Sequence, residues 1–137
     1  MLRQPPLGLS VNIEVIRTVD PENRRVQFTS PAGSASGMWC DELEPQPGNY
    51  DVEFEIVGEV QRWDHAQPSR GRIEDAGDRP GVSITGMVER VDEDFTVALR
   101  VQSDILLIET PEHAPPVAPG TYLCFTVSCL ELYPYQL

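Results

Sequence analysis

The sequence predicts an all-β protein, a single domain folded as an antiparallel barrel or sandwich of about eight short strands. Short runs of alternating apolar and polar residues recur at intervals of roughly 8–12 residues, and turn-forming residues separate them. Thirteen prolines and ten glycines in 137 residues disfavour long helices. No segment carries the apolar period of about 3.6 residues that an amphipathic helix needs. An OB-like barrel of five strands is the alternative architecture.

Three short matches indicate an internal repeat. They lie about 72 residues apart and occur in the same order: Gly8-Leu9-Ser10-Val11 with Gly81-Val82-Ser83-Ile84, Val15-Ile16-Arg17-Thr18-Val19-Asp20 with Val88-Glu89-Arg90-Val91-Asp92, and Pro47-Gly48-Asn49-Tyr50 with Pro119-Gly120-Thr121-Tyr122. The single domain, residues 1–137, is therefore predicted to contain two quasi-repeats of four strands, at about 8–60 and 81–133. A long loop at 61–80 joins them.

In the first quasi-repeat, strands are expected at 10–19 and 25–29, where alternate apolar residues would face the core. A turn containing Asp, Pro and Asn separates these two strands. Residues 30–37 are rich in Gly, Ser and Ala and are expected to form a flexible loop, followed by a short strand at 38–40. The fourth strand begins at a Pro-Gly turn and covers residues 47–60.

The fourth strand has the strictest alternation in the chain. Because successive side chains of a strand point to opposite faces, one face is predicted to be core and the other a row of carboxylates. The apolar residues are Tyr50, Val52, Phe54 and Ile56, and the acidic residues are Asp51, Glu53 and Glu55, with Glu59 beyond them.

In the second quasi-repeat, strands are expected at 82–91, 95–101, 105–108 and 122–133. The last of these is apolar on nearly both faces, so both faces must be covered. We expect the loop 61–80 or the chain termini to cover it, with a second subunit as the alternative. The loop itself has no apolar period, and one short helical turn at its residues 72–76 is expected.

The charge of the chain narrows the classes of partner. A formal net charge of -12 and a pI near 4.4 argue against nucleic acids and anionic membranes, which attract basic surfaces. The same charge favours a basic protein partner. All ten basic residues are arginine, which is typical of a GC-rich bacterium. Because neither a signal peptide nor an apolar run of about 20 residues is visible, the cytoplasm is the expected location.

The inventory of catalytic residues is small. The chain contains three cysteines and two histidines, His65 and His113, and none of the common catalytic or nucleotide-binding motifs. The acids around Asp64 and Glu74 alternate with arginines, which indicates solvated charge. We therefore expect no metal and no cofactor. A metal- or Cys/His-dependent enzyme, using His65 or the pair Cys40 and His113, remains an alternative.

The strongest functional signal is the row of carboxylates at Asp51, Glu53, Glu55 and Glu59, beside the aromatic residues Trp39 and Tyr50. Like charges along one strand face repel each other, so the row points to a role beyond solubility. We expect a non-catalytic protein-binding module, a monomer or homodimer, that docks on a basic partner as an immunity protein or enzyme inhibitor does. The alternative is a barrel that binds a small ligand near Trp39, Trp63 and Tyr133.

Overall fold

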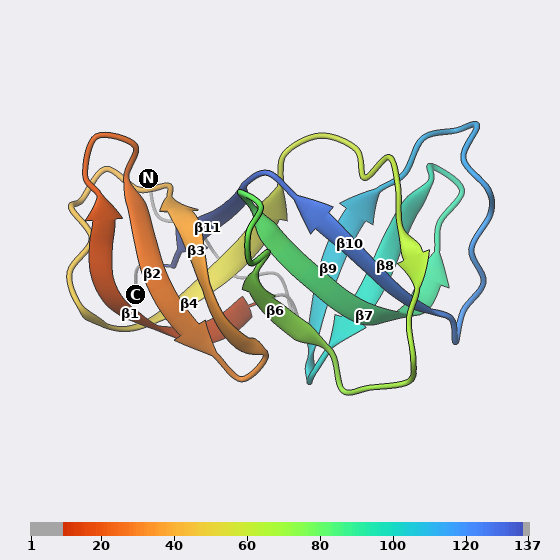
Figure 1. Cartoon of the computed structure of the whole chain (residues 1–137), viewed down its shortest axis with the longest axis horizontal. Helices are drawn as coiled ribbons and strands as arrows, with labels where there is room; N and C mark the ends of the chain where they lie inside the picture. Colours follow the sequence, from red (N-terminus) through yellow and green to blue (C-terminus); the bar gives the residue numbers. More distant parts are fainter. Residues whose placement is uncertain (1–9, 136–137) are drawn as a thin grey trace.

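The computed structural model describes residues 10–135, and every regular element in that range is a strand (Figure 1). The prediction of an all-β fold is confirmed. Gly8 and Leu9, which begin the first repeat match, lie outside the described residues. The strands are β1 (Ser10–Asp20), β2 (Arg25–Ser30), β3 (Gly33–Trp39), β4 (Gly48–Ile56), β5 (Asp64–His65), β6 (Arg72–Asp75), β7 (Val82–Val91), β8 (Thr96–Val101), β9 (Asp104–Glu109), β10 (Tyr122–Val127) and β11 (Leu130–Pro134).

Five strands close into a barrel with the order β1-β2-β3-β11-β4, on the left of Figure 1. Neighbouring strands are antiparallel except β3 and β11, which run parallel with Glu131 opposite Met38. Gly37 of β3 is buried, and a Cβ at this position would lie 3.0 Å from the carbonyl oxygen of Leu130. The absence of a side chain here lets β11 approach β3. The predicted OB-like alternative also has five strands, but the barrel seen here makes up only half of the fold.

The other half is a six-stranded sheet on the right of Figure 1, with the order β5-β10-β7-β8-β9 and with β6 also paired to β7. Both β6 and β8 lie on the same side of β7. The first pairs with the beginning of β7, at Val82 to Thr85, and the second with its end, at Met87 to Val91. The strand β10 covers the opposite side of β7.

The two halves share one strand order, β3-β2-β1-β4 in the barrel and β9-β8-β7-β10 in the sheet. A register shift falls between Val15 and Arg17 of β1, and another falls between Val88 and Arg90 of β7. These residues are equivalent in the sequence matches. The turns that follow also correspond, because Arg24 and Phe95 both have positive φ angles, of 53° and 66°.

Each half is completed by a segment that follows the other half in the chain. After β4, the chain crosses to the sheet, where Glu59 pairs in parallel with Glu109 and β5 pairs with β10. After β10, the chain crosses back, and β11 enters the barrel between β3 and β4. We call residues 59–65 and β11 the closing segments. Because each closing segment joins the two halves, we expect them to unfold as one cooperative unit.

The predicted strand 122–133 is two strands, and this corrects the expectation that its two apolar faces need an outside cover. In β10 the odd-numbered residues Leu123, Phe125 and Val127 are buried. In β11 the even-numbered residues Leu130 and Leu132 are buried instead. The inward phase changes at residues 128–129, where the chain passes from the sheet to the barrel.

The region between the quasi-repeats is also structured, so the expected long loop with a helical turn is wrong. Here β6, a strand of the sheet, packs against β3 of the barrel, at the centre of Figure 1. Ile73 is buried, and its N–H donates to the carbonyl oxygen of Ala32 at 3.0 Å. Gly33 has a φ of 134°, and a Cβ there would lie 2.6 Å from the Ile73 oxygen. The small residues expected to form a flexible loop at 30–37 instead build β3 and admit β6.

The apolar side chains of both halves form one continuous core. Its members come from the barrel, from β6, from the sheet and from both closing segments. Among them, Val60 belongs to the first closing segment, and Leu130 and Leu132 belong to the second. Because one core serves both halves, the closing segments bury apolar surface as well as completing the hydrogen-bonded ladders.

Replacing Leu132 with Ala should destabilise the protein by about 2–5 kcal/mol, because Leu132 is 0% exposed and the change leaves a cavity in the barrel. Urea unfolding followed by circular dichroism would measure the loss. Leu43→Ala is the matched control, because Leu43 is 65% exposed and its loss should change stability by no more than about 0.5 kcal/mol. Equal losses in the two variants would show that β11 is not part of the folded core.

Candidate functional site

The carboxylates of β4 lie on the outer face of the barrel and are joined there by one from β11. Antiparallel pairing places Glu131 opposite Glu55, and Tyr133 opposite Glu53. The side chains of Val52 and Phe54 between them are buried, whereas those of Glu53, Glu55 and Glu131 are half-buried. We define the acidic face as the outward side chains of two paired strands: Asp51, Glu53 and Glu55 of β4 and Glu131 of β11.

Hydroxyl and amide donors hold these carboxylates in place. Tyr133 donates to Glu131 Oε1 at 3.0 Å, and the hydroxyl of Tyr135 donates to Glu53 Oε1 at 3.3 Å. At the other end of the face, Asn12 Nδ2 donates to Asp51 Oδ1 at 3.2 Å. A carboxylate fixed in this way loses less side-chain entropy when it binds a partner.

The aromatic residues predicted as interface anchors have a different position. Trp39 is only 2% exposed, and its Nε1–H donates to the Leu43 carbonyl oxygen at 3.0 Å. Tyr50 contacts it edge-on, with ring centroids 4.9 Å apart, and its hydroxyl donates to the Gln46 carbonyl oxygen. Together they fix the connection between β3 and β4. Trp39 is thus a core residue, and the aromatic residues that contact the carboxylates are Tyr133 and Tyr135.

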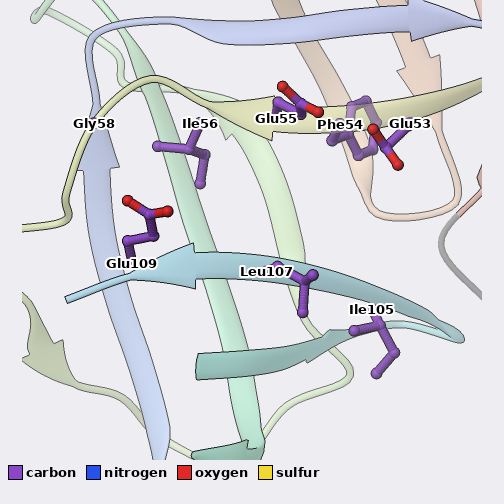
Figure 2. A pocket seen from close by; sticks show the side chains of 8 residues that line it. All are labelled: Glu53, Phe54, Glu55, Ile56, Gly58, Ile105, Leu107 and Glu109. Atoms are coloured by element: carbon purple, nitrogen blue, oxygen red, sulfur yellow. The ribbon is translucent and has the colours of Figure 1, made fainter. Parts of the chain in front are cut away.

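A cleft with a volume of about 370 Å³ separates β4 from β9. Figure 2 shows Glu53, Phe54, Glu55 and Ile56 along the β4 wall, and Ile105, Leu107 and Glu109 along the β9 wall. The carboxylate of Glu109 points into the space between the strands, beside Ile56. Leu107 is 41% exposed, which is high for a leucine. The cleft thus combines an apolar lining with carboxylates from both walls.

The predicted residue Glu59 is separate from the acidic face. It is exposed in the first closing segment, where it accepts a hydrogen bond from Gln61 Nε2 at 3.2 Å. Its backbone pairs with Glu109, and the preceding residue, Gly58, lines the cleft. Glu59 itself does not line the cleft.

Two carboxylates at the site were missed from the sequence. Glu131 faces Glu55 only because β11 returns to the barrel, and Glu109 faces β4 only because the two halves meet there. The change of inward phase between residues 127 and 130 was the one local signal of that return. Nothing in the sequence around Glu109 indicates its position.

The residues considered for catalysis are not brought together. His65 is exposed on β5, and His113 is exposed in the connection between β9 and β10, on the far right of Figure 1. Cys40 directly follows β3 of the barrel. Burial and the neighbouring Glu131 raise the pKa of the Cys40 thiol, which keeps it in its less nucleophilic form. Within residues 10–135, no three His, Cys, Asp or Glu side chains are arranged to hold a metal ion.

One interior cavity lies near the barrel core and is small. A cavity between the two halves, lined by Val11, Phe54 and Ile73 among others, has a volume of about 10 Å³. This is roughly the space of one water molecule. Of the residues named for a small-ligand site, Trp39 is buried in the barrel, whereas Trp63 lies in the first closing segment and packs against the core.

Comparisons with known proteins do not place this chain in a family. No protein-family model matches the chain, and a search of curated proteins gives no match. The part of the chain that the structure describes contains no helix long and apolar enough to cross a bilayer.

Tyr133 should titrate well above its ordinary pKa near 10, because burial and the adjacent Glu131 carboxylate both disfavour the phenolate. The folded state then holds this proton where the unfolded state releases it. The stability that it contributes is complete below about pH 10 and is lost as the pH rises above that value. Urea unfolding at about pH 9 and about pH 11 should show a smaller loss of stability in Tyr133→Phe than in the wild type.

Absorbance of the phenolate provides the direct check, with Tyr122→Phe as the control. The chain contains no lysine, so no lysine side chain titrates in this alkaline range. A wild-type titration curve in which all four tyrosines ionise together near pH 10 would contradict the expectation.

Proposed function

We propose that the chain is a non-catalytic cytoplasmic binding module that docks on a basic protein through the acidic face, as an immunity protein or an enzyme inhibitor does. The observation that carries this proposal is the pairing of Glu55 with Glu131 across β4 and β11, with Glu53 in the next row. Like charges directly opposite each other in a sheet destabilise it. A cationic partner reverses the sign of that interaction.

The geometry favours a protein partner over a metal ion. The carboxylates of the acidic face spread along two strands and, within the described residues, form no metal-binding group. Arginine and lysine side chains suit such a row, because each carboxylate can accept charge-assisted hydrogen bonds. The net charge of -12 would further accelerate the encounter with a basic surface at low ionic strength.

A second candidate function is the binding of a small ligand in the cleft between β4 and β9. Its support is the apolar lining from Phe54, Ile56 and Leu107 and the volume of about 370 Å³. That volume is at the lower end of the range of roughly 300–1,000 Å³ for ligand pockets. This site differs from the predicted one near Trp39, Trp63 and Tyr133.

A matched pair of double variants tests the docking proposal. Glu55→Gln with Glu131→Gln should weaken the binding of a fluorescent oligoarginine peptide about tenfold at low salt, because two charges leave the face. Glu22→Gln with Glu93→Gln removes the same net charge from two exposed turns and should change the affinity less than about twofold. Fluorescence anisotropy at two salt concentrations measures both effects.

If both double variants lost the same affinity, the peptide would be attracted by the net charge of the protein and not by the acidic face. A peptide affinity that does not change with salt concentration would also count against the proposal. If a neutral apolar compound raised the melting temperature of the wild type but not of Leu107→Arg, the second candidate would be favoured.

A further inference from the structure

A second hollow lies where the chain passes between the two halves, and its volume is about 300 Å³. One wall consists of residues in the stretch 56–62, which leads from β4 into the first closing segment. The other wall consists of Thr126 and Val127 at the end of β10 and of Ser128, which leads to β11. A ligand in this hollow would therefore contact both connections between the halves.

Part of the lining is apolar and continuous with the core. Val60 and Val127 belong to the core, with only 4% and 8% of their surfaces exposed. Ile56 is half-buried, whereas Val57 is 62% exposed. Covering Val57 with an apolar group would remove its surface from water, which favours the binding of such a group.

Two opposite charges line the same hollow without neutralising each other. The carboxylate of Glu59 accepts a hydrogen bond from Gln61 Nε2 at 3.2 Å. Arg62 forms no salt bridge and no side-chain hydrogen bond, either with Glu59 or with any other residue in the part of the chain that the structure describes. The hollow therefore offers one guanidinium and one carboxylate to a single ligand.

The lining complements a small molecule that has two opposite charges and an apolar group. A guanidinium can bind a carboxylate through two parallel N–H donors, and a carboxylate can accept hydrogen bonds from an ammonium group. The volume of about 300 Å³ is at the lower end of the range for pockets that hold drug-sized ligands, so a smaller molecule suits it. Free α-amino acids with apolar side chains combine these properties.

We propose that this hollow binds a free α-amino acid with an apolar side chain. Its carboxylate would contact Arg62, its ammonium group would contact Glu59, and its side chain would cover Val57. Because the ligand would contact both connections between the halves, it would also stabilise the folded chain. The hollow is separate from the acidic face, so amino-acid binding does not depend on the proposed function.

Four ligands, titrated into the full-length chain at neutral pH, separate these contacts: leucine, leucinamide, N-acetyl-leucine and N-acetyl-leucinamide. Leucinamide lacks the carboxylate, and N-acetyl-leucine lacks the ammonium group. Leucine should bind about tenfold more tightly than either, because each of them loses one charge-assisted contact. N-acetyl-leucinamide lacks both charges and should bind most weakly. Backbone NMR shifts measure the affinities, and the largest changes should occur at Gln61, Arg62 and Ser128.

A matched set of variants assigns each charge. Arg62→Gln should abolish the preference for leucine over leucinamide and keep the preference for leucine over N-acetyl-leucine. Glu59→Gln should have the opposite effect. Arg79→Gln and Glu93→Gln remove the same charges from exposed positions outside the hollow and should keep both preferences. Circular dichroism confirms that each variant is folded.

Three results would overturn the inference. If leucine at about 10 mM caused no shift changes, the hollow would not bind amino acids. If leucine and N-acetyl-leucinamide bound equally, the two charges would take no part in binding. If Leu107→Arg abolished the binding of leucine and Arg62→Gln did not affect it, the ligand would occupy the cleft between β4 and β9 instead.

Discussion

The structure depends on an exchange of closing segments between its two halves. β11 follows the sheet in the chain but completes the barrel, and residues 59–65 follow the barrel but complete the sheet. Each crossing buries apolar side chains in the core that both halves share. We therefore expect the two halves to fold and unfold together. Non-local pairing of this kind is also expected to make folding slow.

The candidate site is a product of this exchange. The return of β11 brings Glu131 opposite Glu55 and supplies the Tyr133 and Tyr135 hydroxyls that hold the carboxylates. The opposite crossing brings Gly58 to the cleft and pairs the backbone of Glu59 with Glu109. The two walls of the cleft thus come from different halves. The two crossings set the distance between these walls. The candidate site and the fold depend on the same pairings.

Local patterns explain which parts were predictable from the sequence. Strict alternation in β1, β4 and β7 made their positions and buried faces evident, because one side chain in two must face the core. The small residues of β3 instead resemble a loop, although Ala35 is buried and Gly37 leaves room for β11. In β6, a single buried Ile73 stands among charged residues, which gives no period to detect.

The pairing partners of each strand were much harder to predict from the sequence. The strand at 122–133 was predicted as one element because its apolar residues are continuous, although their inward phase changes near residue 128. A phase change marks a bend but does not reveal which sheet the next strand joins. For that reason Asp51, Glu53 and Glu55 could be assigned to one face from the sequence, whereas Glu131 and Glu109 could not.

Two tryptophans permit the most direct test of the exchange, because Trp39 lies in the barrel and Trp63 lies in the segment that completes the sheet. Trp63→Phe leaves Trp39 as the reporter of the barrel, and Trp39→Phe leaves Trp63 as the reporter of the sheet. Urea unfolding of each variant should give tryptophan fluorescence and circular dichroism transitions with the same midpoint, as one cooperative unit requires. A fluorescence midpoint that departs from the circular dichroism midpoint in either variant would show that the halves unfold separately and would contradict the exchange.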